Sequence, residues 1–319
     1  MNFSIIPFET ITKFGQQTML DRPLFNISWI LGRFCNYSCS YCWPYARSDK
    51  LDYQSLEVYK STIDEIKRQA RANGFTQFHW SFSGGEPTAY KELPNLIKHI
   101  DELESPYQSI HMTTNLSPGS NWWKNWCNIT MPLQRKSITA SFHAEHAKEQ
   151  EFGDKCLQLM YERVHVTVNQ VMVPDKFYET LERCERLRSR GINVTLKPQS
   201  NDTASAIVDG YTDDMITIMQ NDFEQQEGYQ IRLTDGVRDY YIDQAERFNA
   251  LGFNKFAGWS CNSGYQSVII KGTEVKRAYS CNDPALGNIL TGFELFKAPQ
   301  RCNTPTCVSS ADSKIPKEK

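Results

Sequence analysis

The sequence predicts an α/β protein with a parallel sheet, followed by a smaller cysteine-rich domain. Strand-like and helix-like runs alternate from residue 26 to about 200, and four of the ten cysteines lie in the last sixty residues. Strands that alternate with helices imply βαβ units and a parallel sheet. We count about six such units, fewer than the eight of a complete barrel. The expected fold is therefore a partial (β/α)6 barrel with a small C-terminal domain made of a β-hairpin and loops.

Hydrophobic periodicity places the individual elements. Apolar residues recur at helical spacing from Leu56 to Ala70, and Gly74 supplies a stop. Aromatic residues alternate with polar ones over 77–82, which indicates a strand that ends at Gly84 and Gly85. A helix with Pro94 in its first turn follows. Further strands are expected at 109–115, 136–143, 163–173 and 193–199, with a charged helix at 177–190.

Composition bounds the class of protein. The chain has 319 residues, a formal net charge of -2 and a sequence pI of about 6.3, so no overall basic field suggests a nucleic-acid surface. It holds no run of roughly 18 apolar residues that could span a membrane. The N-terminal segment also lacks the pattern of a signal peptide. We therefore expect a cytoplasmic protein without a membrane partner.

The pattern divides the chain into four parts. Residues 1–25 form an N-terminal extension, 26–240 the α/β core and 255–310 the second domain, in which 265–281 reads as a β-hairpin turning at Lys271, Gly272 and Thr273. The polar, lysine-rich tail at 311–319 is expected to be disordered.

Three cysteines, Cys35, Cys39 and Cys42, lie within eight residues in the loop after the first strand. In a reducing compartment, clustered cysteines more often bind metal or perform chemistry than form disulfides. Three thiolates can hold three irons of a [4Fe–4S] cluster and leave the fourth iron without a protein ligand. The alternatives are a zinc site that a distant histidine or cysteine completes, or chance spacing.

This triplet, with the aromatic Tyr41 just before the third cysteine, resembles the signature of the radical S-adenosylmethionine (SAM) superfamily. The segment SGGEPT at 83–88 matches the family's GGE motif in order and spacing. The resemblance covers roughly residues 26–240. It implies that SAM chelates the open iron, and that an electron from the cluster cleaves SAM to a 5′-deoxyadenosyl radical that abstracts hydrogen from substrate.

The resemblance also implies a set of cofactor-binding residues. In the glycine segment, two carbonyls and one carboxylate can receive the ammonium of SAM, and strand-end residues contact its ribose and carboxylate. A Gly-Gly pair also serves as simple turn punctuation, and strand-end polar residues often act as caps. The expected positions are Tyr41, Gly84, Gly85, Glu86, Asn115, Ser141 and Gln170.

A second group of cysteines supplies four thiolates, enough to close another [4Fe–4S] cluster completely. With the intervening hairpin, this region resembles the twitch extension, a shortened relative of the SPASM domain. The resemblance implies one auxiliary [4Fe–4S] cluster, and a structural zinc site is the alternative. The expected ligands are Cys261, Cys281, Cys302 and Cys307.

Some residues are candidates for catalysis. Cys127, Cys156 and Cys184 could donate a hydrogen atom to a substrate radical, or could be small buried hydrophobes. His143 and Glu145 could perform acid–base work, or could cap a loop. The arginines of the helix at 177–190 read as a solvated face paired with glutamates, or as a phosphate or nucleic-acid contact.

The expected function is radical SAM chemistry on a small-molecule or modified-nucleotide substrate, by dehydrogenation, epimerisation or isomerisation. The enzyme would then be an oxidoreductase or an isomerase, and would need a reductant of the flavodoxin or ferredoxin type. Three alternatives stay open: a radical isomerase of amino-acid-modified thymidine in phage DNA, a ribosomal-peptide maturase, and a non-enzymatic iron–sulfur or zinc binding module.

Overall fold

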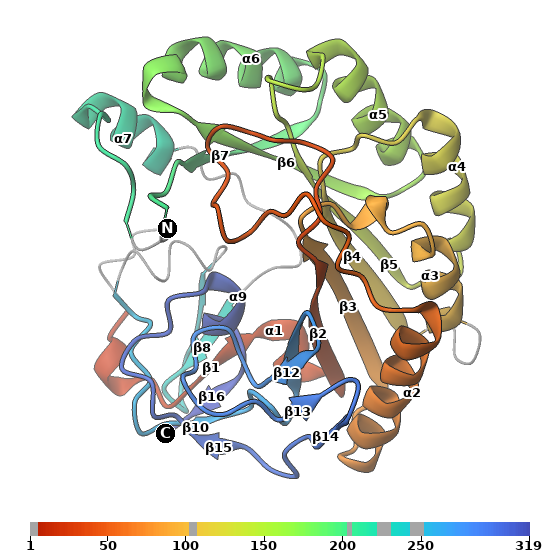
Figure 1. Cartoon of the computed structure of the whole chain (residues 1–319). Helices are drawn as coiled ribbons and strands as arrows, with labels where there is room; N and C mark the ends of the chain where they lie inside the picture. The colour runs from red at the N-terminus through yellow and green to blue at the C-terminus, as the bar shows by residue number, and fades with distance from the viewer. Residues whose placement is uncertain (1–5, 102–106, 203–205, 222–230, 243–251) are drawn as a thin grey trace. The chain divides into compact units, whose positions relative to one another are not determined.

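A computed structural model describes the chain except for residues 1–5, 102–106, 203–205, 222–230 and 243–251 (Figure 1). The chain forms two compact units. The first comprises residues 1–28, 57–79 and 225–319, and the second comprises 29–56 and 80–224. The two ends of the chain therefore belong to the same unit, and the segments that precede and follow the α/β core fold together.

The second unit is built on strands that end in chemically distinctive loops. The strands lie in the order β2-β3-β4-β5-β6-β7, and β4 to β7 pair in parallel, with Ser109 opposite Arg135 at the start of the β4–β5 pair. The strands β2 and β3 begin in the first unit and end in the second. Their bounds are β2 Leu24–Gly32, β3 Gln77–Gly84, β4 Gln108–Thr114, β5 Arg135–Ser141, β6 His165–Met172 and β7 Asn193–Pro198.

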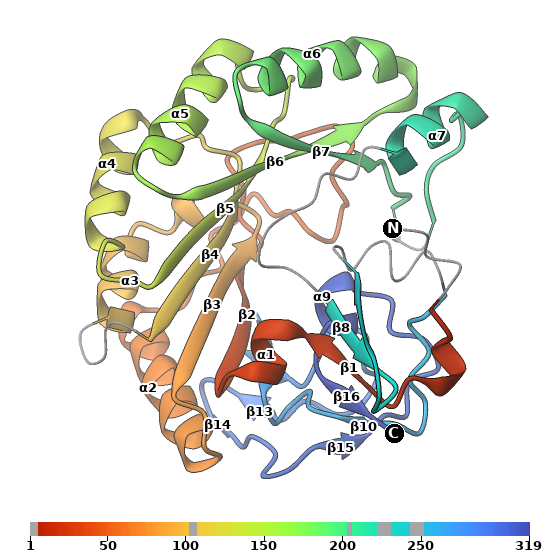
Figure 2. The ribbon, with the colours of Figure 1, turned by 180° about the vertical axis from the view of Figure 1, so that it is seen from behind.

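Helices α3 to α6 cover one face of these strands (Figure 2). Alternate strand residues are fully buried, as Ile110 and Met112 are in β4, because every second side chain points to the same face. The helices are α3 Leu93–Asp101, α4 Ser120–Ile129, α5 Glu149–Tyr161, α6 Phe177–Ser189 and α7 Asp213–Asn221, with short 3-10 turns η3 Pro87–Ala89 and η4 Pro174–Lys176. The predicted mixed α/β fold with a parallel sheet is confirmed, and it is consistent with a partial barrel.

The first unit contains an antiparallel sheet of six short strands in the order β15-β10-β16-β1-β8-β9. These strands are β1 Lys13–Gln16, β8 Ile231–Thr234, β9 Asp239–Ile242, β10 Ser260–Cys261, β15 Gln300–Arg301 and β16 Lys317–Glu318. The turn η2 Phe8–Thr10 and the helix α1 Gln17–Asp21 flank β1. The N-terminal segment is thus one strand of a sheet that the C-terminal region completes.

The predicted hairpin is confirmed. The strands β11 Ser267–Lys271 and β12 Glu274–Lys276 pair antiparallel, with Lys271 opposite Glu274, and Gly272 takes a positive φ of 60° in the turn between them. Glycine meets that backbone requirement without steric cost. The strands β13 Gly287–Asn288 and β14 Gly292–Phe293 extend this sheet in the order β14-β13-β12-β11.

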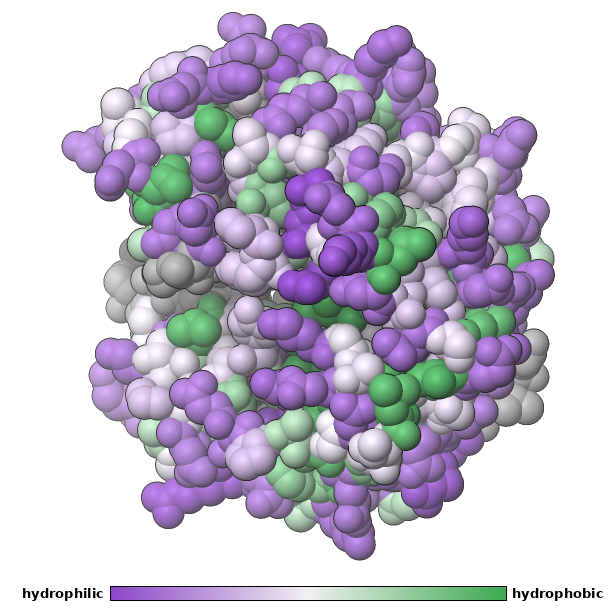
Figure 3. Space-filling model, viewed as in Figure 1, coloured by the Kyte–Doolittle hydropathy of each residue, from purple (hydrophilic) through white to green (hydrophobic). Residues whose placement is uncertain are grey.

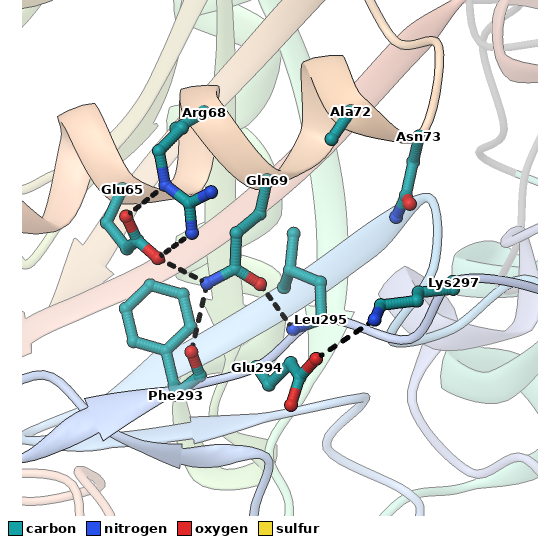
Figure 4. Close-up of a pocket in the computed structure, with 9 residues that line it drawn as sticks. All are labelled: Glu65, Arg68, Gln69, Ala72, Asn73, Phe293, Glu294, Leu295 and Lys297. Carbon is teal, nitrogen blue, oxygen red and sulfur yellow. Dashed lines mark hydrogen bonds and ion pairs between the residues drawn. The ribbon is translucent and has the colours of Figure 1, made fainter.

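Helix α2 Leu56–Ala72 packs in the first unit against the segment 293–297, where a cavity of about 320 Å3 opens (Figure 4). The polar groups that line this cavity are bonded to one another. The amide of Gln69 donates to the carbonyl of Phe293 at 2.9 Å and accepts from the N–H of Leu295 at 2.7 Å, and Arg68 pairs with Glu65. The two bonds of Gln69 hold the segment 293–297 against α2.

The tail is ordered, so the expectation of disorder at 311–319 is wrong. Helix α9 Ser310–Ser313 leads into β16, which pairs with both β1 and β10. The Lys317 side chain is only 3% exposed, and its ammonium donates to the carbonyls of Asp312, Ser313 and Ile315 at 2.8–3.2 Å. Composition alone suggested a solvated tail because it cannot show that a lysine is satisfied by backbone carbonyls.

In the described part of the chain, no helix is long and apolar enough to cross a membrane. The face of the molecule in Figure 3 is largely hydrophilic, with hydrophobic residues in scattered patches. Large exposed apolar side chains include Trp43 and Tyr45, whose rings stack at 5.9 Å.

Candidate functional site

The loop that carries the first cysteines begins directly after β2. The Asp52 carboxylate accepts the backbone N–H of Arg33 at 2.9 Å and that of Phe34 at 3.3 Å, which fixes the start of the loop. Within the loop, the N–H of Cys42 donates to the carbonyl of Cys39 at 3.1 Å. The Cys35 sulfur also takes part, because it accepts the N–H of Tyr37 at 3.4 Å.

The three thiols lie within electrostatic range of one another and are partly open to solvent. Cys35 and Cys39 are half-buried and Cys42 is exposed. Burial raises the pKa of all three thiols, to about 12 for Cys39, where Glu145 and the other two thiols add to the effect. A metal ligand must be a thiolate, so metal binding here releases protons.

The two glycines at the end of β3 pack directly against the end of β2 and the start of the cysteine loop. A Cβ on Gly85 would lie 2.1 Å from the carbonyl oxygen of Phe34, and one on Gly84 would lie 2.2 Å from that of Gly32. The N–H of Gly85 donates to the same Gly32 oxygen at 3.0 Å, and that of Glu86 to Phe34 at 2.8 Å. Both positions therefore require glycine because the backbone of the cysteine loop occupies the side-chain space.

The Glu86 carboxylate accepts four hydrogen bonds from other residues of the protein. One oxygen accepts from Thr88 N–H at 3.0 Å, Thr88 O–H at 2.7 Å and Thr114 O–H at 2.8 Å, and the other accepts from Asn115 N–H at 2.7 Å. The residue is 1% exposed, and burial raises the pKa of Glu86. The carboxylate thus ties the glycine segment to the end of β4, which sequence reasoning missed because the bond partners lie 28 and 29 residues away.

One of the strand-end residues reaches the cysteine loop. The Asn115 side chain donates to the Asn36 side chain at 2.9 Å, so the end of β4 is bonded to the cysteine loop. Ser141 ends β5 opposite Asn169. Gln170 instead shares its face of β6 with the buried Val168, and its Oε1 has no hydrogen-bond partner among the described residues.

The turn after β5 contacts the cysteine loop. The Tyr41 hydroxyl lies 2.8 Å from Nδ1 of His143, and the Glu145 carboxylate accepts the N–H of Ser40 at 2.9 Å. Burial, with His146 nearby, lowers the pKa of His143 to about 4, so its ring is neutral at neutral pH. Tyr41 and the acid–base candidates therefore share one network.

The remaining catalytic candidates lie in the core. Cys127, Cys156 and Cys184 are between 0% and 3% exposed, and burial raises the pKa of Cys156 to about 12.

Every arginine singled out near α6 has a carboxylate partner: Arg183 with Glu179 and Glu149, Arg186 with Glu149, Arg188 with Glu185, and Arg190 with Asp154. This pairing favours structural ion pairs over a phosphate contact.

The second cysteine group lies in the first unit. Cys261, Cys302 and Cys307 belong to one hydrophobic cluster, and Cys281 packs against it. Burial alone would raise the pKa of Cys261, but Lys317, a hydrogen bond with Ser263 and Arg277 outweigh it and hold that pKa below its usual value.

The chemistry of the donor sets fits iron–sulfur ligation, with three thiols in one loop and four in one cluster. In the described residues, however, no three cysteine, histidine or acidic side chains stand in a metal-coordinating arrangement. The fit therefore rests on ligand type and grouping, and the cofactor-binding roles of the individual residues stay predictions.

Comparison with known proteins identifies the family of the chain. Residues 29–221 match the model of the radical SAM superfamily. Among solved structures, native anSMEcpe with bound AdoMet is similar with a TM-score of 0.54 at 15% identity, over 85% of this chain and 79% of that one. The same protein with bound AdoMet and Kp18Cys peptide has a TM-score of 0.50 at 14% identity, over 85% and 78%. These likenesses support the fold, and since the family match spans more than half of the residues, the chain belongs to the radical SAM superfamily.

Proposed function

We propose that the chain is a radical SAM enzyme that takes hydrogen from a small-molecule or modified-nucleotide substrate, with Cys35, Cys39 and Cys42 as the ligands of its catalytic cluster. The observation that carries the proposal is the packing of the glycine segment and the end of β4 onto the cysteine loop. Membership of the family implies an enzyme that binds a [4Fe–4S] cluster and SAM. Such a cluster, when bound, supplies the electron that cleaves SAM and so generates the radical that abstracts hydrogen.

The residues of the second unit have separable tasks in this proposal. The loop thiolates hold the metal, and Gly84 and Gly85 let the backbone of the glycine segment approach the loop closely. Glu86 orients the end of β4 through Asn115. We propose that Tyr41 and Ser141 line the SAM site; Gln170, also expected there, lies on the opposite face of the sheet from Ser141, beside the buried Val168.

The second cysteine group is proposed to bind an auxiliary [4Fe–4S] cluster. Three of the cysteines belong to one hydrophobic cluster and Cys281 packs against it, so four protein thiolates are available to close the site. Lys317 stands directly opposite Cys261 in the β10–β16 pair, where paired side chains share a face. The buried positive charge of Lys317 offsets the negative charge of the thiolates.

A peptide substrate is the second candidate function. The similar structure of anSMEcpe is recorded with a bound Kp18Cys peptide, which is a specific reason to test peptides. A nucleic-acid substrate lacks the support of the arginines near α6, because carboxylates neutralise them. Dehydrogenation, epimerisation and isomerisation remain open as reaction types.

Anaerobic reconstitution tests the proposal. We expect about eight irons per wild-type chain, as two four-iron clusters require, and SAM cleavage on addition of dithionite. Cys42→Ala should abolish SAM cleavage, Cys307→Ala should lose about half of the iron, and the buried-core control Cys127→Ala should keep both. Bound zinc without iron, together with no SAM cleavage, would refute the radical SAM assignment of this site.

A further inference from the structure

The loop from Cys35 to Cys42 is held from outside by one short turn, residues 143–146, which follows β5. The backbone N–H of Ser38 donates to Nε2 of His146 at 3.2 Å. The N–H of Ser40 donates to Oε2 of Glu145 at 2.9 Å, and the Ser40 hydroxyl donates to Oε1 of the same carboxylate at 2.5 Å. Hydrogen bonds to an ionised carboxylate are about twice as strong as neutral ones.

Aromatic contacts complete the grip. The ring of Tyr37 stacks on His146 with centroids 4.7 Å apart and an interplanar angle of 21°. The ring of Tyr41 stacks on His143 at 5.8 Å and 24°, and its hydroxyl meets Nδ1 of that histidine at 2.8 Å. The turn therefore touches four of the five non-cysteine residues that lie between Cys35 and Cys42.

The turn is itself firmly supported. Its backbone closes through the N–H groups of His146 and Ala147, which donate to the carbonyl of His143 at 3.0 and 2.9 Å. Phe142, just before it, is 2% exposed and packs edge-on against Phe152 at 4.9 Å. A segment anchored in the core can position the loop it contacts, whereas a freely mobile segment cannot.

We propose that residues 143–146 form a clamp that positions the three cysteines for cluster binding, and that the Glu145 charge tunes the bound cluster. This inference rests on the proposed function of the loop. It assigns His143 and Glu145 a positioning role in place of direct acid–base work on substrate. Groups outside the ligand set that orient metal ligands commonly change metal affinity by about 10- to 100-fold when they are removed.

The two tasks of Glu145 can be separated by substitution. Glu145→Gln keeps an oxygen that accepts from the Ser40 N–H and places an amide that donates to the Ser40 hydroxyl, so it removes only the charge. Glu145→Ala removes the bonds as well. Glu151→Gln is the matched control, because Glu151 is an exposed carboxylate whose ion pair is with Lys148.

The readouts are iron release to a chelator and the reduction midpoint of the SAM-responsive cluster, recorded by EPR. For Glu145→Ala we expect release of four irons about tenfold faster than from wild type. For Glu145→Gln we expect release within twofold of wild type and a midpoint shifted to more positive potential, because removing a nearby negative charge favours the reduced cluster. Glu151→Gln should change neither quantity.

Each outcome decides one part of the inference. Wild-type release rates in Glu145→Ala would overturn the clamp, and an unshifted midpoint in Glu145→Gln would overturn the charge effect. If Glu145→Ala does not fold, as far-UV circular dichroism would show, wild-type spectra and midpoint in Glu145→Gln still refute the tuning role. A wild-type protein without a SAM-responsive EPR signal would instead refute the proposed function on which the inference rests.

Discussion

Replacing Glu86 with glutamine should destabilise the fold, although the two side chains have nearly the same shape. The buried carboxylate has two accepting oxygens that serve four donors, two of which are the backbone N–H groups of Thr88 and Asn115. Those N–H groups can only donate, and they meet opposite oxygens of the carboxylate. A glutamine amide has one accepting oxygen, so one of the two N–H groups must face an amide NH2.

The magnitude follows from that single mismatch. The hydroxyls of Thr88 and Thr114 can rotate to accept from the new amide, but a backbone N–H cannot. One buried donor left without an acceptor costs about 1–3 kcal/mol. We therefore expect Glu86→Gln to lower the free energy of unfolding by about that amount, and Glu86→Ala, which strands all four donors, to lower it further.

Denaturant unfolding of the metal-free protein measures this effect. A lower midpoint with an unchanged slope identifies a change in stability. Glu92→Gln is the matched control, because Glu92 is an exposed carboxylate that accepts from the Asn95 side chain at 2.7 Å. The reasoning is refuted if Glu86→Gln unfolds at the wild-type midpoint, since that result would show that the donors of Thr88 and Asn115 are satisfied in another way.

Four further predictions follow from individual contacts. Gly85→Ala should abolish iron binding by the cysteine loop, measured as iron per chain after reconstitution, because its Cβ would collide with backbone carbonyls; Gly119→Ala, which meets nothing within 4 Å, should bind iron like wild type. Lys317→Met should reduce metal retention at the second cysteine group, measured by metal content after gel filtration. Cys156→Ala should leave SAM cleavage intact and cost about 1 kcal/mol of stability, because this thiol is fully enclosed in the core. Glu149→Gln should cost at most about 1 kcal/mol at neutral pH; hydrogen bonds from an arginine lower the pKa of the Glu149 carboxyl in the folded state, so the difference from wild type should vanish as pH falls through that pKa.

Local patterns were enough to predict the main architecture. Aromatic residues alternating over β3 and apolar residues at helical spacing in α2 are each read from neighbouring positions, and burial enforces both. The order of the cysteine loop and the glycine segment along the chain also predicted that both would lie at the ends of strands. Parallel topology brings such ends together whatever the intervening loops contain.

The roles of single polar residues were harder to predict because they depend on distant partners. Glu145 bonds to Ser40 across 105 positions, and Glu86 to the end of β4 across 28 or 29. Nothing near Glu86 distinguishes a carboxylate that holds the protein together from one that receives a cofactor. The signal would have been the number of backbone N–H donors that the ends of β3 and β4 bring to the Glu86 carboxylate. That number can be known only once the fold is known.

Cys39 of the loop group and Cys261 of the second group differ in their electrostatic surroundings, and the difference matches their burial. In the loop group, Glu145 adds negative charge beside Cys39, and the cysteines are half-buried or exposed, so water can screen the thiolates. In the second group, Cys261 lies in a hydrophobic core, where an unpaired charge is costly. Lys317 and Arg277 bring buried positive charge to that core. The buried Cys261 thiolate needs such cations because solvent does not screen its charge, whereas the more exposed thiolates of the loop can leave theirs to the solvent.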